Sequence, residues 1–220
     1  MIRAVILDFD DTLVKTKEMS FEKHELVGRH FGYFLDKEVF HANYGKPWPE
    51  IIKKIFPGLA FSDFYKHLIE LEKNYPFQEI DGATDTLRQL QQRGMALGIL
   101  TSDFQESFFR RASLLGHLDY FDHHLIFCAD NNVYSKPDGR AFLSVLAGLQ
   151  VRGVSKDHVA FVGDLLTDYQ AAKEAGITFF AVTTGFKTAN DFIQAGLSPE
   201  YILPSIAELP KRLETYGDSS

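Results

Sequence analysis

The sequence predicts an α/β fold in which a doubly wound parallel sheet carries a small inserted helical domain. Three observations lead to this prediction. Five short apolar runs have the composition of buried strands. Stretches with helical spacing separate most of these runs, and glycines end them. After the first run comes a long helical segment, where such folds usually have a connection of about 2 to 6 residues.

The apolar runs are rich in Val, Ile, Phe and Leu and are too short to be helices. They are Ala4–Leu7, Ala96–Leu100, Leu125–Cys128, Val159–Val162 and Phe179–Val182. The clearest helical stretches between them are Ala83–Arg93, Phe104–Leu115 and Tyr169–Ala175, and each is followed at once by a glycine. Alternation of strand and helix in this way favours parallel strands joined by crossover helices.

The segment after the first strand shows helical spacing and little strand character. It holds 13 of the 30 aromatic residues of the chain, counted from Phe21 to Phe77. A small domain needs bulky side chains to form a core of its own. We therefore expect a core domain at residues 1–14 and 78–220, and an inserted helical domain at residues 15–77. The chain end, Gly217–Ser220, is expected to fray.

Composition and charge exclude several function classes. The formal net charge of −7 argues against non-specific binding to nucleic acid or to an anionic membrane. We find neither a run of apolar residues long enough to span a bilayer nor a signal peptide. The single cysteine, Cys128, excludes an internal disulfide and a thiolate metal site, and we expect it to be buried. Together these features predict a cytoplasmic protein.

Acidic residues follow two of the predicted strands. Asp8 and Asp10 come directly after the first strand, and Asp164 and Asp168 follow the fourth. Ligands of an open parallel sheet bind beyond the carboxyl ends of its strands, so these four acids should share one crevice. Their mutual repulsion, about 4 kcal/mol for two charges some 4 Å apart, favours a divalent cation there. Oxygen ligands with room for water suit Mg²⁺. Asp11 is expected on the surface.

Residues that bind anions follow the other two strands. Thr101 and Ser102 come at a transition from strand to helix, where free N–H groups and a hydroxyl form an anion site. Both Ser102 and Asp103 could begin a capping box there. Lys136 precedes Pro137, a residue typical of a first helical turn, so its ammonium should also reach the crevice. A cation, a lysine and a hydroxyl around one anion point to phosphate.

These motifs resemble those of the haloacid dehalogenase-like superfamily, whose core is Rossmann-like, and in particular its phosphatases with a helical cap after the first strand. The first motif, Asp-x-Asp-x-Thr, is present from Asp8 to Thr12. The resemblance implies that Asp8 is the nucleophile, which forms an aspartyl phosphate, and that Asp10 is the general acid and base. Thr101 then takes the place of the second motif and Lys136 that of the third.

The fourth motif of the superfamily is acidic, and it corresponds to the segment from Gly163 to Asp168. Leu165 departs from the pattern, because a small hydroxyl residue often stands there. The resemblance implies that Mg²⁺ is held by four acids, which are Asp8, Asp10, Asp164 and Asp168. It does not settle whether Asp168 contacts the metal directly or through water.

The inserted segment contains a loop, Asn43 to Trp48, that resembles the cap loop reaching over the active site in this superfamily. Gly45 would allow a close approach to the substrate, and Lys46 would meet a second anionic group, although a plain turn with a solvated lysine fits equally well. This loop and the segment from Tyr201 to Leu209 resemble those of phosphoglycolate phosphatases. The expected partner is a small phosphorylated metabolite such as 2-phosphoglycolate, and either a monomer or a homodimer is compatible.

Other functions remain open at this point. The main alternative is phosphoryl transfer between sugar hydroxyls, as in relatives of β-phosphoglucomutase. Carbon–halogen hydrolysis needs no acid for its leaving group, and phosphonate cleavage needs a lysine Schiff base, so an acidic Asp10 argues against both. A protein that keeps the fold and only binds a ligand is also conceivable, and the intact acids argue against it.

Overall fold

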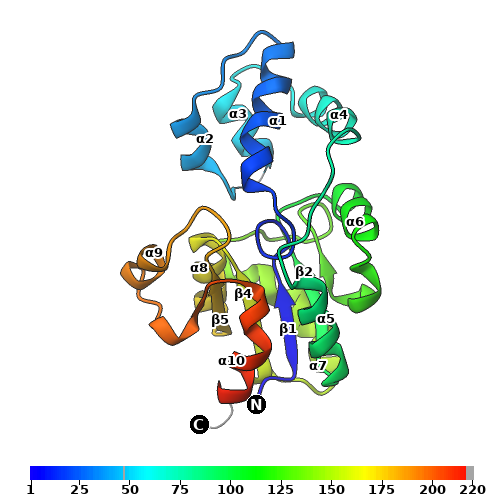
Figure 1. Cartoon of the computed structure of the whole chain (residues 1–220), viewed down its shortest axis with the longest axis vertical. Helices are drawn as coiled ribbons and strands as arrows, with labels where there is room; N and C mark the ends of the chain where they lie inside the picture. Colours follow the sequence, from blue (N-terminus) through cyan, green and yellow to red (C-terminus); the bar gives the residue numbers. More distant parts are fainter. Residues whose placement is uncertain (47, 217–220) are drawn as a thin grey trace.

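A computed structural model describes residues 1–46 and 48–216, so the expected frayed end at Gly217–Ser220 lies outside the described residues. One parallel six-stranded sheet forms the centre of the larger part of the molecule (Figure 1). The strands are β1 (Ala4–Leu7), β2 (Ala96–Leu100), β3 (Ile126–Phe127), β4 (Val159–Gly163), β5 (Thr178–Val182) and β6 (Ile202–Leu203). Their order is β3-β2-β1-β4-β5-β6, so β1 lies between β2 and β4. The predicted fold class is confirmed.

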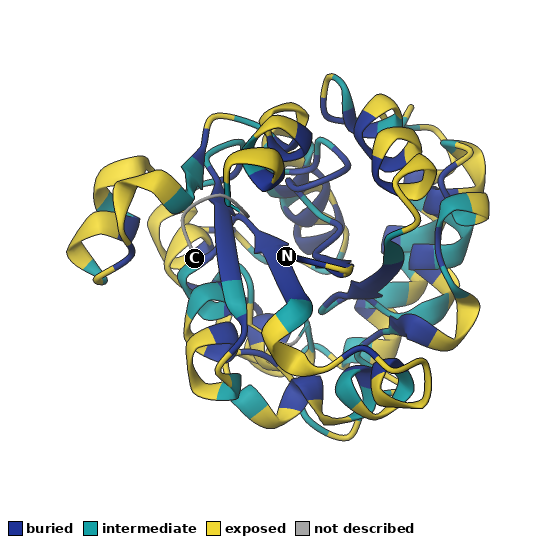
Figure 2. Cartoon of the chain, turned by 90° about the horizontal axis from the view of Figure 1, so that it is seen from below, coloured by how far each residue is buried: buried dark blue, intermediate teal, exposed yellow. Residues whose placement is uncertain are grey.

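Helices cover both faces of this sheet, which explains why its strands are mostly apolar. One face is covered by α5 (Ala83–Gln92), α6 (Gln105–Leu114) and α10 (Leu209–Tyr216), the other by α7 (Leu143–Val151), α8 (Leu166–Ala175) and α9 (Ala189–Gln194). Successive residues of β1 alternate between the two apolar cores, with Val5 and Leu7 in the first and Ala4 and Ile6 in the second. Figure 2 shows the buried strands inside a ring of helices whose outer faces are exposed.

The short elements differ most from the sequence prediction. β3 has two residues instead of four, because Leu125 belongs to a preceding 3-10 helix. β6 is equally short and is not predicted at all. α8 begins three residues earlier than expected, since the carboxylate of Asp168 accepts a hydrogen bond from the backbone N–H of Leu165 and stabilises the first turn. The remaining 3-10 helices are Leu118–Tyr120, His123–Leu125, Gly139–Phe142, Lys156–His158, Pro199–Tyr201 and Ile206–Glu208.

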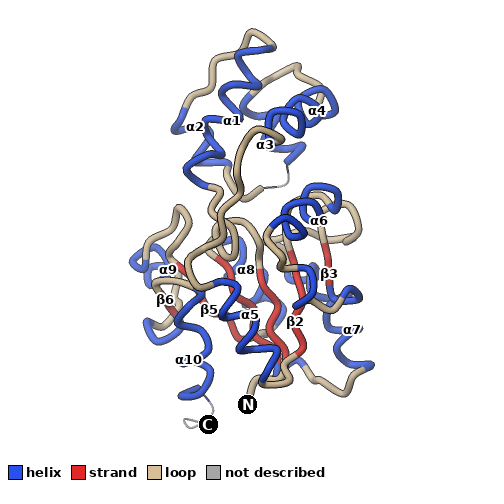
Figure 3. Tube along the Cα trace, turned by 45° about the vertical axis from the view of Figure 1, so that its right-hand side comes forward, coloured by secondary structure: helices blue, strands red, loops and turns tan. Residues whose placement is uncertain are grey.

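Four further helices form a second body beyond the carboxyl edge of the sheet (Figure 3). They are α1 (Lys17–His30), α2 (Lys37–Asn43), α3 (Trp48–Ile55) and α4 (Phe61–Glu72). They enclose an apolar cluster of their own, which is separate from the two cores around the sheet. We call this body the cap. Within the described residues no helix is long and apolar enough to cross a membrane.

Two chain segments connect the cap to the sheet, and they run side by side. The N–H of Lys15 donates to the carbonyl of Gln78 at 2.8 Å, and the N–H of Ile80 donates to the carbonyl of Leu13 at 2.8 Å. This paired hinge supports our proposal that residues 15–77 are an insertion into the core domain.

The cap core is closely packed around aromatic rings. Phe40, Phe56 and Phe64 are fully buried there. Gly28 of α1 lies against Phe56. A Cβ atom at this position would come within 2.5 Å of the ring. A glycine is therefore required where α1 meets the chain after α3.

His24 of α1 belongs to this aromatic cluster. Its ring lies 4.9 Å from Phe40, 5.3 Å from Trp48 and 5.2 Å from Phe64, measured between ring centroids. Its Nδ1 lies 2.7 Å from the carbonyl oxygen of Ser20. Burial lowers the pKa of His24 to about 4, so the side chain is neutral at physiological pH.

We expect acid to destabilise the cap through His24. Because its pKa is lowered from 6.5 to about 4, its contribution to stability is complete above pH 6.5 and is lost as the pH falls through 4. The lost contribution amounts to about 3 kcal/mol. Urea unfolding between pH 6.5 and 4, followed by the fluorescence of Trp48, the single tryptophan, measures this effect.

The matched variants are His24→Gln, which should lose about 3 kcal/mol less stability than the wild type between pH 6.5 and 4, and His123→Gln, which removes an exposed histidine and should follow the wild type. Equal slopes in the wild type and in His24→Gln would contradict the assignment.

Candidate active site

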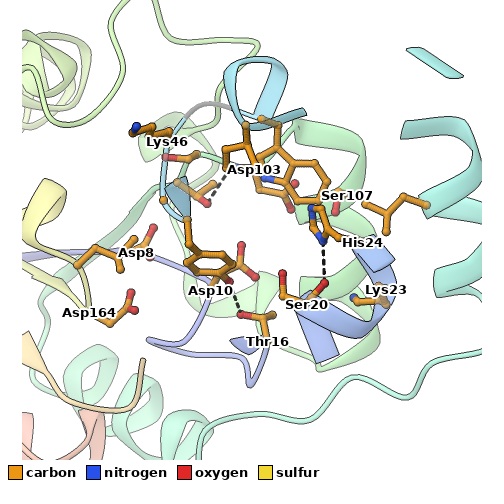
Figure 4. A pocket seen from close by; sticks show the side chains of 18 of the residues that line it. Asp8, Asp10, Thr16, Ser20, Lys23, His24, Lys46, Asp103, Ser107 and Asp164 are labelled. Carbon is orange, nitrogen blue, oxygen red and sulfur yellow. Dashed lines mark hydrogen bonds between the residues drawn. The ribbon is translucent and has the colours of Figure 1, made fainter. Parts of the chain in front are cut away.

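The polar residues that follow the strands meet at the carboxyl edge of the sheet. Asp8 leaves β1, Asp164 leaves β4 and Thr101 leaves β2, and these three strands are neighbours. Lys136 arrives from the loop between β3 and α7. All four side chains are buried and line one pocket that is shared with the cap. Figure 4 shows Asp8 and Asp164 on one side of this pocket and Lys23 and His24 on the other.

Three of the predicted metal ligands form a compact group. One carboxylate oxygen each from Asp8, Asp164 and Asp168 lies within 4.8 Å of the others, and all three residues are buried. Burial raises the pKa of Asp164 well above its usual range, and the neighbouring Asp168 raises it further. Burial also raises the pKa of Asp8, to about 7, although Lys136 opposes this. Three acids so close together call for a cation.

A divalent cation fits this group of carboxylates. Within the described part of the chain, neither carboxylate oxygen of Asp164 has a hydrogen-bond partner, although both are buried. Buried polar atoms are normally satisfied, so these two oxygens mark a place for a ligand of opposite charge. The donors are all hard oxygens, which suit Mg²⁺ better than a soft metal.

Lys136 bridges two of these acids. Its Nζ lies 2.7 Å from Asp8 and 2.6 Å from Asp168. Burial would lower the pKa of Lys136, but Asp168 and Asp8 together raise it above its usual value, so the ammonium stays charged. Asp168 also accepts the hydrogen bond from Leu165 that begins α8. Asp168 therefore holds both the lysine and the start of this helix.

Asp10, the fourth predicted metal ligand, lies outside the group of three. Its carboxylate binds the guanidinium of Arg111 with both oxygens, at 2.5 Å and 3.0 Å. Burial alone would raise the pKa of Asp10, but Arg111 more than offsets this, and the pKa lies below its usual range. The structure thus places the two aspartates of the first motif with different cations, Asp8 with Lys136 and Asp10 with Arg111.

Asp11 is buried, so the expectation of a surface position is wrong. Its carboxylate accepts hydrogen bonds from the N–H groups of Thr16 and Lys17, each at 2.8 Å, at the start of α1. The hydroxyl of Tyr44 donates to it as well, at 3.3 Å. Burial raises the pKa of Asp11 to about 6. Asp11 therefore connects the end of β1 to the first helix of the cap, a task that its position in the sequence does not reveal.

The anion site after β2 differs in detail from the prediction. Thr101 is buried and Ser102 half-buried, and both line the pocket as expected. Neither predicted capping box forms, because α6 begins only at Gln105, whose N–H donates to Asp130 instead. The chain first makes a turn in which the N–H of Asp103 donates to the hydroxyl oxygen of Thr101.

The cap loop reaches the pocket as proposed. Gly45 and Lys46 both line it, and the Nζ of Lys46 donates to Asn43 at 2.8 Å. Gly45 touches Leu165, since a Cβ at Gly45 would come within 2.3 Å of the leucine side chain. Leu165, the residue that departs from the fourth motif, thus makes an apolar contact between core and cap. Pro47 of the same loop lies outside the described residues.

Aromatic contacts also join the cap to the core. Phe61 of α4 stacks on Phe104, with ring centroids 5.5 Å apart. His41 and Tyr44 each lie 4.7 Å from Phe186. These contacts indicate a closed arrangement in which the pocket is covered.

Sequence reasoning missed several residues that line the pocket. They are Thr16, Ser20, Lys23, His24, Phe40, Ile51, Leu68, Glu72, Asp103, Ser107 and Arg111, whereas the lining residues Tyr44, Trp48 and Leu165 belong to the predicted cap loop and the fourth motif. Most belong to helices of the cap, where aromatic and apolar residues are also expected for packing alone. Arg111 lies within α6 and belongs to no motif.

Comparison with known proteins agrees with this geometry. A family model described as haloacid dehalogenase-like hydrolase matches residues 5–182. The chain belongs to this family. The predicted resemblance and the predicted class of hydrolase are therefore confirmed.

Relatives match nearly the full length. Phosphoglycolate phosphatase from Thiobacillus denitrificans is 26% identical and covers 94% of this chain and 93% of its own. Pyrophosphatase PpaX from Oceanobacillus iheyensis is 25% identical and covers 99% and 98%. Among solved structures, CbbY from Rhodobacter sphaeroides in complex with xylulose-1,5-bisphosphate has the same fold, with a TM-score of 0.79, 22% identity, and coverage of 95% and 96%.

We expect Mg²⁺ to stabilise the protein through Asp164. A ligand that binds only the folded state, at about 100 times its Kd, adds about 2.7 kcal/mol, which for a chain of this size raises Tm by roughly 5 to 10 °C. Asp164→Asn removes a charged ligand and should abolish most of this shift. Thermal unfolding with and without MgCl₂ measures it.

Asp157→Asn is the matched control, because this acid is exposed and belongs to a 3-10 helix that precedes β4. An equal Mg²⁺ shift in Asp164→Asn and in the control would exclude the group of three acids as the metal site.

Proposed function

We propose that this hydrolase is a Mg²⁺-dependent phosphatase that cleaves a small phosphorylated metabolite through an aspartyl phosphate. The observation that carries the proposal is the pairing of Asp8 with Lys136 beside Asp164, at the bottom of a pocket that the cap covers. A carboxylate nucleophile, a cation and an acidic metal site are what phosphoryl transfer requires.

The proposed reaction has two halves. An oxygen of Asp8 attacks phosphorus, and the bond from phosphorus to the ester oxygen breaks. Asp10, which Arg111 keeps ionised at rest, first takes up a proton from solvent and then gives it to the departing alkoxide. Asp10 then takes a proton from the water that cleaves the acyl phosphate, which regenerates Asp8 and releases phosphate. Asp10 is 26% exposed and faces the pocket, so it can reach a leaving group there.

The remaining polar residues stabilise charge on the phosphoryl group. Lys136 lies next to Asp8 and would neutralise one phosphoryl oxygen, and Thr101 and Ser102 would donate hydrogen bonds to others. Asp8, Asp164 and Asp168 would hold Mg²⁺, with Asp168 acting directly or through water. The metal, when bound, neutralises the phosphate and reduces its repulsion from Asp8.

The substrate is proposed to be a small metabolite. The pocket lies between cap and core and is closed by the aromatic contacts described above, so a folded protein does not fit inside it. The relative named phosphoglycolate phosphatase makes 2-phosphoglycolate the first compound to test. A cytoplasmic location and a monomeric or homodimeric state stay predictions.

Phosphoryl transfer to a sugar hydroxyl is the second candidate. The hydroxyls of Thr16, Ser20 and Ser107 and the ring of Trp48 line the pocket, a combination that suits a sugar. Product analysis with a hexose 1-phosphate distinguishes the two reactions, because a transferase yields an isomeric phosphate and a phosphatase yields free sugar.

A screen of phosphorylated metabolites with Mg²⁺, read by phosphate release, tests the proposed function. We expect Asp8→Asn to lower turnover by at least about 10³-fold, because it removes the only route to the covalent intermediate. The variant has nearly the same shape, so its melting temperature serves as the folding control. Retention of most of the activity would refute the proposed nucleophile.

We further expect Lys46→Ala to discriminate between substrates. If Lys46 binds a second anionic group, its loss should reduce kcat/KM for 2-phosphoglycolate about 10-fold or more, and for a neutral aryl phosphate much less. Lys53→Ala, which removes an exposed lysine of α3, is the control. Equal losses on both substrates would show that Lys46 does not bind the second anionic group of the substrate.

A further inference from the structure

We propose that Arg111 is a positioning residue for Asp10, a role that rests on the phosphatase function proposed above. Arg111 comes from the last turn of α6 and is only 4% exposed, whereas the carboxylate of Asp10 that it binds is 26% exposed. A substrate in the pocket therefore meets Asp10 before it meets Arg111. The guanidinium acts through the carboxylate and does not need to touch the reacting atoms.

The contact between the two residues fixes the plane of the carboxylate. Nη1 of Arg111 binds one oxygen of Asp10 at 2.5 Å, and Nη2 binds the other at 3.0 Å. A two-point contact between a planar guanidinium and a carboxylate defines orientation as well as distance. Lysine, a single point of charge, would not define it.

Arg111 is itself held in place from two directions. Its Nη2 also binds the carboxylate of Asp103, which is 1% exposed and accepts the N–H of Phe104 at 2.9 Å. Its guanidinium lies 4.9 Å from the ring of Phe9, measured to the ring centroid. A rigid path thus runs from the end of β2 through Asp103 and Arg111 to Asp10.

This arrangement separates the two aspartates of the first motif. Asp8 and Asp10 leave the same strand end two residues apart, and both carboxylates would be attracted by a cation at the acidic group. Arg111 holds Asp10 outside the 4.8 Å group of Asp8, Asp164 and Asp168. In this position Asp10 still lines the pocket.

Loss of Arg111 should affect substrates according to their leaving groups. An alkyl phosphate needs a proton on its departing oxygen, whereas p-nitrophenolate leaves without one. General acid catalysis contributes about 10² to 10⁴-fold, and a misplaced group loses much of it. For Arg111→Gln we expect about a 100-fold loss in kcat/KM with an alkyl phosphate. With p-nitrophenyl phosphate, the loss in the rate of the first half-reaction should stay below about 10-fold.

The neighbouring Arg110 provides a matched control. It lies on the same helix, contacts the same Phe77 ring and forms an ion pair with Glu72 at 2.5 Å, but not with Asp10. Arg110→Gln should leave the ratio between alkyl and aryl substrates unchanged. Arg111→Lys keeps the charge, and thus folding, while it loses the two-point contact, so it should show a smaller loss with the same dependence on leaving group.

A double-mutant cycle with Asp10→Asn completes the test. If Arg111 acts through Asp10, then Arg111→Gln should cost less than about 3-fold in the Asp10→Asn background. Losses that multiply, or equal losses on alkyl and aryl substrates in the active Arg111 variants, would refute the role of Arg111 and leave the proposed function intact. A wild-type protein that releases phosphate from no ester would refute the proposed function, and the role of Arg111 with it.

Discussion

The site depends on the concentration of negative charge at one edge of a parallel sheet. Because β1 and β4 are neighbouring parallel strands, the acids that follow them lie close together. The surrounding apolar cores make this charge expensive, since burial disfavours ionised carboxylates. Lys136 and Arg111 offset part of the cost. Within the described residues the two oxygens of Asp164 have no hydrogen-bond partner, so a further cation at this place would offset more of the cost.

Buried charged residues also connect the cap to the sheet domain. Asp11 binds the start of α1 and the hydroxyl of Tyr44, so the first motif supplies the connection to the cap as well as the proposed catalytic groups. On the far side of the pocket, Lys23 and Arg110 both bind Glu72, which is buried. Because Arg110 belongs to α6 and Glu72 to α4, this ion pair joins the sheet domain to the cap. The same ion pairs therefore neutralise a buried acid and connect the cap to the sheet domain.

The sequence allowed most of the fold and part of the site to be predicted, for identifiable reasons. Apolar strands such as β1 and β4 are recognisable because burial on both faces leaves little freedom in composition. β6, with two residues, carries no such signal. Asp8, Lys136 and Asp164 are predictable as neighbours because each follows a strand, and the carboxyl ends of parallel strands lie at one edge of the sheet. Arg111 was missed, since a helical arginine is usually solvated and nothing local shows that α6 directs it inward. Asp11 was misplaced for a similar reason: its partners lie in the segment after it in the chain.

The contact between Gly45 and Leu165 has a consequence for how such a molecule can change. Gly45 and Leu165 pack against each other between the cap and the sheet domain. A larger residue at position 45 would therefore need a smaller one at position 165. A serine in place of the leucine would remove this contact, but the positive φ of Gly45, 88°, would still favour glycine in the loop. This contact therefore couples the cap loop to the residue after Asp164, two regions that are far apart in the chain.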